Sequence, residues 1–307
     1  MSQTAAYLGC TTTALATWEK RLWSLLRSCV LCPHRCRVDR LAGETGKCHT
    51  GSRAIVYNYF PHFGEESPLV GDCGSGAIFF SFCNLACCFC QNWEISHGGE
   101  GLELQSEHVA TMMLELQAMG CANINLVTPS HVVPQIVTAV RLAREQGLHL
   151  PLVYNCGGYE RVATLRELEG IIDIYMPDFK FWSSASAARY CGAEDYPERA
   201  RAALREMHRQ VGDLSIDRDG LARRGLLVRH LVLPGLEQES GAILKFLAQE
   251  ISQETYVNIM DQYRPCGTAV GDPRLGDELE REQWLRVLRA ARAAGLHRFD
   301  HGMMLLS

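Results

Sequence analysis

The sequence lacks the features of membrane proteins and of nucleic-acid-binding proteins. No apolar run approaches the roughly 20 residues that a membrane helix needs. The 307 residues hold 30 Lys and Arg against 35 Asp and Glu, so the net charge is −5 and there is no basic excess to attract nucleic acid. We therefore expect neither a membrane partner nor a nucleic-acid partner.

A secretory leader is also missing from the first twenty residues. The stretch MSQTAAYLGCTTTALATWEK has no basic segment followed by an apolar one, so the expected location is the cytoplasm. No Gly-x-Gly-x-x-Gly motif follows the first predicted strand, which counts against a dinucleotide-binding fold.

Cysteine, by contrast, is abundant. Fourteen cysteines in a chain of this length, in a reducing compartment, indicate metal binding or chemistry rather than disulfides. Eight of them form two groups along the sequence, and the others are scattered. The first group is Cys29, Cys32, Cys36 and Cys48, and the second is Cys83, Cys87, Cys88 and Cys90.

From residue 76 onward, apolar runs rich in β-branched residues alternate with helical patterns. This alternation predicts an α/β fold, here a partial (β/α) barrel of about six parallel strands covered on both faces. A seventh, short strand is predicted at 297–300. The six main strands are predicted at 77–82, 123–128, 151–155, 171–176, 226–233 and 256–261.

Residues 1–75 have a different character. A helix is predicted near 11–27, and the segment CVLCPHRCRVDRLAGETGKCHTG then combines cysteines with turn-forming and basic residues. We predict two parts, a small N-terminal appendage with a helix and a cysteine-rich metal-binding segment at 1–75, and the partial barrel at 76–307. In barrels of this kind the chemistry gathers at the carboxyl ends of the strands, where the second cysteine group lies.

The second group follows the first predicted strand in the pattern C-x-x-x-C-x-x-C. A structural zinc needs four ligands, and a redox disulfide needs only a C-x-x-C pair. A 4Fe–4S cluster held by Cys83, Cys87 and Cys90 alone leaves one iron open for an outside ligand, because each iron usually takes one thiolate. Cys88 is then a spare thiol.

This loop resembles the signature of the radical S-adenosylmethionine superfamily. The segments GSGAIFFSFCNLACCFCQNWEIS, NINLVTPSH, YMPDFK and LLVRHLVLPG, together with the first cysteine group, are similar to its pyruvate formate-lyase activating enzyme-like group. The resemblance covers about residues 29–300. It implies an oxidoreductase that binds S-adenosylmethionine at the open iron and cleaves it reductively to a 5′-deoxyadenosyl radical for hydrogen abstraction.

The resemblance also implies partners. The substrate is expected to be a protein, such as a glycyl-radical enzyme to be activated, or a small molecule, and the electron donor a protein such as flavodoxin or ferredoxin. The alternative without catalysis is an iron–sulfur or zinc carrier. A carrier has no need of a cofactor pocket, so the residues at the later strand ends separate the two hypotheses.

Polar residues at the ends of the later strands are the candidates for binding the cofactor. Many radical enzymes carry Gly-Gly-Glu after the second strand, but here that position reads NINLVTPSH, and the Gly-Gly-Glu at 98–100 comes too early and is interpreted as a loop. Asp178 and Lys180 match the D-x-K motif that, by resemblance, holds the ribose and the methionine carboxylate. The complete set is Thr128, Ser130, His131, Asn155, Asp178, Lys180, Arg229 and His230.

Several of these residues also have purely structural interpretations. Asn155 is equally suited to stabilising a turn. Asp178 and Lys180 project from one face of an extended segment, where they can form an ion pair at the barrel rim. Arg229 and His230 point to opposite faces if they lie in a strand, and His230 fits a hydrogen-bonded core histidine as well.

The first cysteine group has the spacing C-x2-C-x3-C-x11-C, which indicates a metal site. Zinc and a 4Fe–4S cluster both accept four cysteines, so the spacing leaves the metal open. A second cluster would relay electrons to the radical cluster, whereas zinc would staple a segment too poor in core to fold alone.

Overall fold

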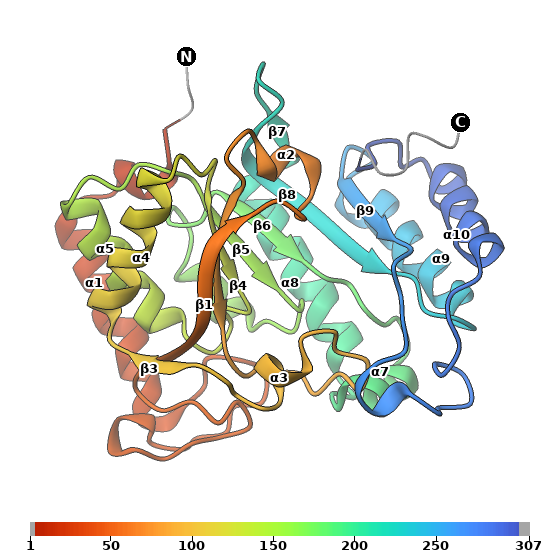
Figure 1. The fold of residues 1–307 in the computed structure, drawn as a ribbon, viewed down its shortest axis with the longest axis horizontal. Coiled ribbons are helices and arrows are strands. Elements are labelled where there is room, and N and C mark those ends of the chain that lie inside the picture. Colours follow the sequence, from red (N-terminus) through yellow and green to blue (C-terminus); the bar gives the residue numbers. More distant parts are fainter. Residues whose placement is uncertain (1–3, 301–307) are drawn as a thin grey trace.

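The computed structural model describes residues 4–300, which form one curved sheet with helices packed around it (Figure 1). The strand order is β3–β1–β2–β4–β5–β6–β8–β7, and β9 pairs with β8. The strands are β1 (Ala54–His62), β2 (Ser75–Phe80), β3 (Leu102–Leu104), β4 (Ile124–Val127), β5 (Leu152–Cys156), β6 (Ile174–Pro177), β7 (Ser215–Ile216), β8 (Ala222–Leu231) and β9 (Tyr256–Met260).

Six of these strands are parallel neighbours, in the order β2, β4, β5, β6, β8 and β9. Four of them, β2, β4, β5 and β6, are almost wholly buried, as expected for parallel strands covered on both faces. The predicted α/β partial barrel of about six parallel strands is therefore confirmed. At the predicted seventh strand, Phe299 forms only an isolated bridge with Val257.

The helices connect the strands and cover the sheet. Helix α5 is buried along most of its length because α1 and α4 both pack against it. Helices α9 and α10 pack against each other, on the same side of the molecule as β9 (Figure 1). The helices are α1 (Thr12–Ser24), α2 (Ser67–Val70), α3 (Trp93–Ser96), α4 (Ser106–Ala118), α5 (Val133–Glu145), α6 (Val162–Arg166), α7 (Ser184–Cys191), α8 (Tyr196–Val211), α9 (Glu237–Phe246) and α10 (Arg281–Ala294).

Short 3-10 helices and one π-helical turn occur in addition to the α-helices. Helix α10 shows how a boundary is set, because Glu280 and Gln283 form a reciprocal capping box at its start and Gly295 takes a left-handed conformation at its end. The short 3-10 helices are Ala6–Gly9, Leu25–Ser28, Arg40–Ala42 and Gly267–Ala269, and a π-helical turn at Leu247–Ile251 continues α9.

Strand β1, which the sequence did not predict, joins the N-terminal part to the barrel. It pairs antiparallel with β2 on one side and with β3 on the other. Leu15 and Leu22 of α1 are fully buried in the same apolar core as Ile136 of α5. The division into 1–75 and 76–307 stays a prediction, while in the structure both parts contribute to one sheet and one core.

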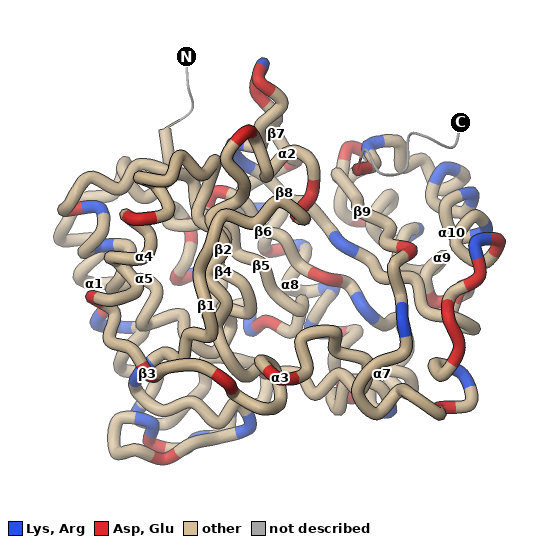
Figure 2. The backbone as a smooth tube through the Cα atoms, in the orientation of Figure 1, with Lys and Arg blue, Asp and Glu red and all other residues tan. Residues whose placement is uncertain are grey.

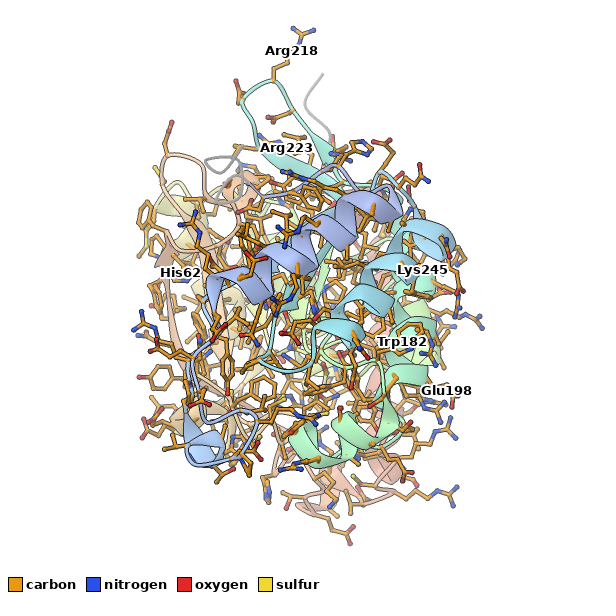
Figure 3. The ribbon with its side chains drawn as sticks, turned by 90° about the vertical axis from the view of Figure 1, so that its right-hand side faces the viewer. His62, Trp182, Glu198, Arg218, Arg223 and Lys245 are labelled. Carbon is orange, nitrogen blue, oxygen red and sulfur yellow. The ribbon has the colours of Figure 1, made fainter. Side chains whose placement is uncertain are left out.

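The sheet is open between β1 and β9. Its ordered path ends at β3 beyond β1, and β9 pairs with β8 at the other side, so within residues 4–300 no strand joins the two sides. Figure 1 shows β1 and β9 facing each other across this opening. A hairpin containing β7 projects from the molecule with Arg218 at its tip (Figure 3).

Within the described part of the chain, no helix has both the length and the apolar character to cross a bilayer. Acidic and basic residues are interspersed along the backbone (Figure 2).

At Gly225, β8 passes close to the backbone of Asp213 and Leu214 in the segment before it. Its φ of +127° lies in a region that side-chain-bearing residues rarely adopt, and its N–H donates to Asp173 O at 3.0 Å. A Cβ at this position would lie 2.4 Å from Asp213 O. Only glycine therefore allows β8 to enter the sheet beside β6 in this register.

We expect Gly225→Ala to lower the free energy of unfolding by about 2 kcal/mol or more, because both the backbone angle and the contact become unfavourable. Gly241→Ala is the matched control, since a Cβ at Gly241 in α9 meets nothing within 4 Å. That variant should gain about 1 kcal/mol from helix propensity. Urea unfolding under reducing conditions measures both, and equal effects would contradict the assignment.

Candidate functional site

The second cysteine group lies in a loop that runs from the end of β2 to α3. The loop is tied to the end of α7 by backbone hydrogen bonds, from Ala86 N to Cys191 O at 3.1 Å and from Cys88 N to Tyr190 O at 2.9 Å. Phe82 has a φ of +62°, which turns the chain sharply after the strand. The loop is thus held at the carboxyl edge of the parallel strands, where the sequence predicted it.

Three of the four thiols in this loop share a cavity of about 280 Å³. Cys83, Cys87 and Cys90 line it, whereas Cys88 is not among the described residues that do. The structure therefore brings together the three cysteines that were predicted as ligands and leaves the predicted spare thiol outside.

Burial keeps these thiols protonated in the absence of a metal. It raises the pKa of Cys83 to about 12 and also raises the pKa of Cys90, while a hydrogen bond to Cys191, together with burial, raises that of Cys87. Among residues 4–300, no three His, Cys, Asp or Glu side chains already form a complete metal-ligand set. Ligation would therefore require the thiols to lose their protons and turn toward the bound group.

A chain of ion pairs crosses the same cavity. Lys180 Nζ lies 2.6 Å from Asp178 Oδ2, and Arg229 Nε lies 2.8 Å from Asp178 Oδ1. Arg229 Nη2 also donates to Asn155 Oδ1 at 2.7 Å. All four residues line the cavity with the thiols, so four of the predicted cofactor-binding residues lie together.

The electrostatics of this chain favour the charged forms. Burial acts to raise the pKa of Asp178, but Arg229 and Lys180 outweigh burial and hold that pKa below its ordinary value. Burial likewise acts to lower the pKa of Lys180, and Asp178 reverses the effect and raises it. The cavity thus contains the charged ammonium of Lys180 and guanidinium of Arg229 next to the carboxylate of Asp178. This arrangement suits a ligand with its own carboxylate and hydroxyl groups.

Thr128 is the fifth predicted residue at this cavity. It follows β4 with a φ of +61°, and its N–H donates to Asn155 O at 2.8 Å. Directly after this turn the chain leaves the cavity, so the next two predicted residues, Ser130 and His131, do not line it.

Ser130, His131 and His230 are not brought to the thiol cavity. Ser130 donates to Glu160, and His131 Nε2 lies 2.9 Å from Ser81 O. His230 lies on the opposite face of β8 from Arg229, with its ring nitrogens 2.6 Å from Phe179 O and 2.8 Å from Ser240 Oγ. For these three residues the structure corrects the expected location, because tertiary partners place them in the core.

The four thiols of the first group line a separate small cavity. Cys29, Cys32, Cys36 and Cys48 surround it, together with the fully buried Arg40. Burial raises the pKa of Cys32 to about 12 and also raises that of Cys48, against the opposing effect of Arg40.

This first group is fastened to the barrel and touches the second loop. Thr164 Oγ1 donates to Leu31 O at 2.6 Å, and Arg161 Nη1 donates to Val30 O at 2.9 Å. His34 Nε2 lies 2.8 Å from Asn84 O, next to Cys83. The two cysteine loops are therefore in direct contact.

A larger cavity of about 680 Å³ adjoins the thiol cavity on the open side of the sheet. Asn155 and Arg229 line both cavities. The larger one also contains Glu65 and Glu66, which the sequence reasoning missed. The signal was the adjacent acidic pair in HFGEESP, but only the unpredicted strand β1 shows that this pair faces inward.

Comparison with known proteins adds a distant relative and some distant folds. No protein-family model matches the chain. An uncharacterized protein of Methanocaldococcus jannaschii, MJ0674, is 27% identical over 276 residues, which span 87% of this chain and 75% of that protein.

Among solved structures, Streptococcus suis SuiB bound to precursor peptide SuiA is similar with a TM-score of 0.48 at 10% identity, covering 71% of this chain and 46% of SuiB. SuiB bound to S-adenosylmethionine gives the same TM-score at 8% identity, over 71% of this chain and 47% of SuiB. This chain thus spans about half the length of SuiB. The glycoside hydrolase domain of PelA from Pseudomonas aeruginosa follows with 0.31 at 16% identity, over 53% of this chain and 63% of that domain. These scores are too low to assign a function.

The buried carboxyl of Glu160, which accepts from Ser130, makes the stability of the protein depend on pH. Glu160 is 1% exposed, and burial raises its pKa to about 7, although Ser130 and Tyr154 donate to it and oppose the shift. A carboxyl whose folded pKa exceeds its unfolded value stabilises the protein at low pH. This contribution is complete below about 4.5 and is lost as the pH rises through about 7.

We therefore expect Glu160→Gln to become more stable relative to the wild type as the pH rises from about 5 to about 8, by on the order of 2–3 kcal/mol. Urea unfolding at both pH values measures this difference. Glu282→Gln, at an exposed side chain of α10, is the control and should show no such trend. A pH-independent difference for Glu160→Gln would contradict the buried-carboxyl assignment.

Proposed function

We propose that this protein is a radical S-adenosylmethionine enzyme. The observation that carries the proposal is that Cys83, Cys87 and Cys90 line the same cavity as the Asp178–Lys180 pair. Three thiols suit a 4Fe–4S cluster with one open iron, and the adjacent charges suit the cofactor's polar groups. When bound together, the cluster and S-adenosylmethionine supply a 5′-deoxyadenosyl radical for hydrogen abstraction.

The residues of the cavity have separable roles in this proposal. The three thiolates hold the cluster, and Lys180 pairs with the methionine carboxylate. Asp178 accepts from Lys180 and Arg229, so it positions both cations and remains available to a ribose hydroxyl. The apolar walls, which include Phe79 and Leu231, exclude water from the reacting atoms.

The charged cavity favours catalysis over a carrier function. A carrier needs ligands for its metal but gains nothing from the partly buried Asp178, Lys180 and Arg229 beside it, and charges withdrawn from water are costly unless they serve a ligand or a fold. Activation of a glycyl-radical protein, with flavodoxin or ferredoxin as electron donor, remains the more specific version of the proposal and follows from the sequence resemblance.

For the first cysteine group we propose an electron-relay cluster. The support is the contact between the two loops, in which His34 touches the backbone of Asn84 next to Cys83. A metal that served only as a staple would not need to lie against the second loop. The relay version therefore predicts iron and sulfide at Cys29, Cys32, Cys36 and Cys48, whereas the staple version predicts zinc.

We expect Cys83→Ala, Cys87→Ala and Cys90→Ala each to abolish the radical cluster at the second cysteine group after anaerobic reconstitution with iron and sulfide. Cys88→Ala is the matched control and should keep it, because Cys88 is held through its backbone and lies outside the cavity. Iron content and cluster absorbance are the measurements. The metal that remains in a variant lacking all three ligands reports on the first group.

The assignment of the ligands fails if Cys88→Ala loses the cluster while Cys90→Ala keeps it. A folded triple variant that carries no metal would show that the first group is not a metal site. Zinc in that variant would overturn the relay.

We expect Lys180→Ala to weaken S-adenosylmethionine binding roughly tenfold or more, since a charge-assisted hydrogen bond to a carboxylate is lost. Iron content should stay near normal, because Lys180 touches the cofactor rather than the cluster in this proposal. Lys245→Ala is the control at an exposed lysine of α9 (Figure 3). Equilibrium binding to the reconstituted protein measures both variants, and equal affinities would remove Lys180 from the pocket.

A further inference from the structure

The larger cavity lies in the opening between β1 and β9, beside the thiol cavity. Its walls come from both sides of the opening, with Phe60 and His62 from β1 and Asn258 and Met260 from β9. At about 680 Å³ it has the size of an organic ligand rather than of a single ion.

Two adjacent carboxylates, Glu65 and Glu66, are buried in this cavity. Their side chains are 7% and 4% exposed. One oxygen of Glu66, Oε1, accepts from Asn258 Nδ2 at 3.0 Å, but the other, Oε2, is buried without a hydrogen-bond partner. Only a protonated Glu65 carboxyl could donate to Glu66 here, so when both glutamates are charged this oxygen lacks a donor and points to a cationic group that the structure does not supply.

The cations of the protein do not satisfy this acidic pair. Arg229 lies 3.9 Å from an oxygen of each glutamate, beyond hydrogen-bond distance, because Asp178 and Asn155 already take its close contacts. His62 is also 3.9 Å from Glu65. Lys180 pairs with Asp178. When Glu65 is ionised, three carboxylates among these side chains would therefore face two permanent cations.

Other acids line the same cavity and strengthen the negative field. Glu94, Glu100 and Asp300 all belong to the lining, while Arg229 is its only lysine or arginine among the described residues. Burial, opposed by Arg229 and reinforced by Glu66, raises the pKa of Glu65 to about 7. A nearby bound cation would therefore favour ionisation of Glu65 beside the charged Glu66.

The wall opposite β9 is aromatic. Phe60 and Phe79 stack with ring centroids 5.4 Å apart, and His62 meets Phe60 edge-on at 5.7 Å. Aromatic faces attract cations and also pack against apolar groups. The cavity therefore combines an acidic end with a wall suited to an uncharged organic body.

We propose that this cavity is the substrate subsite, and that Glu65 and Glu66 bind an ammonium or guanidinium group carried on a mainly apolar body. The proposal rests on the proposed function for the meaning of the neighbouring thiol cavity, since the substrate must lie next to the radical. A cation bound to Glu66 Oε2 would satisfy the orphan acceptor and balance the surplus charge. Arg229 lines both cavities, so it would lie near this cation as well as near the cofactor.

Two other occupants of the acidic pair are distinguished from an organic cation by separate measurements. A divalent metal would have to approach beside Arg229 and would leave most of the cavity empty. The ammonium group of S-adenosylmethionine would have to reach past Arg229 from the thiol cavity. Competition experiments separate these cases from an organic substrate.

The test measures binding of n-butylguanidinium to the full-length protein without S-adenosylmethionine, with neutral n-butylurea as the matched ligand. We expect the cation to bind at least about tenfold more tightly than the urea, and Glu65→Gln with Glu66→Gln to remove that preference. Glu282→Gln is the control variant. A capped pentapeptide with a central arginine serves as a second probe, and its affinity relative to n-butylguanidinium distinguishes a peptide side chain from a free amine or guanidine.

Equal binding of the cation and the urea to the wild type would overturn the subsite, even if the double variant failed to fold. So would tighter binding of Mg²⁺ than of n-butylguanidinium at the same glutamates. In the cluster-loaded protein, competition by S-adenosylmethionine would assign the acidic pair to the cofactor and overturn the proposal. Cofactor cleavage by the wild type is measured separately, so failure of the radical function and failure of the subsite are distinguishable.

Discussion

A guanidinium largely withdrawn from water among apolar strands needs acceptors on several sides, and the way Arg229 obtains them organises the centre of this molecule. Asp178 at the end of β6 and Asn155 in β5 accept directly from it, and the acids before α2 lie 3.9 Å away. Removing such partners singly leaves an uncompensated buried charge, which costs several kcal/mol. Three strands and the segment before α2 are therefore held in one arrangement by one side chain, and the parallel bridge between Asp178 and Arg229 fixes the pairing there.

The same side chain lines two adjoining chambers of different chemistry. On one side lie the three thiols and the Asp178–Lys180 pair, and on the other lie Glu65 and Glu66 with the aromatic wall. Arg229 and Asn155 belong to both linings, so the chambers are adjacent without being equivalent. Under the proposed function, this adjacency would bring a substrate in the second chamber close to the cofactor in the first.

Much of the fold could be predicted because its signals are local. Continuous apolar runs located the six parallel strands, and the cysteine spacing singled out Cys83, Cys87 and Cys90. Strand β1 was missed because AIVYNYFPH lies in the segment interpreted as a cysteine-rich appendage with little regular structure, although its residue types favour a strand and its first half packs inward. Its absence also hid the acidic pair that follows it, since nothing in a local pattern shows that adjacent glutamates face inward.

Three residues were predicted at the cofactor pocket but lie elsewhere, and the physical reason is the same for each. Ser130, His131 and His230 follow or lie in predicted strands, as the cofactor-binding candidates do, and their residue types fit a polar pocket equally well. Their positions were decided by partners far away in the sequence, such as Glu160 for Ser130 and Ser81 for His131. Spacing can place a residue at a strand end, but only the packed structure decides which side of the turn it faces.

The open side of the barrel has its own structural cause, at the far edge of β9. Val257 donates from its N–H to Arg298 O at 2.9 Å and accepts from Asp300 N at 3.2 Å, so the short segment near residue 299 occupies the edge that a further strand would otherwise use. The Asp300 carboxylate then accepts from Tyr256 Oη and from Ser67 N, at the start of α2. Because β9 is covered in this way and not paired with β1, the sheet stays open where the acidic cavity lies, and Asp300 links β9 to the helix that follows Glu66.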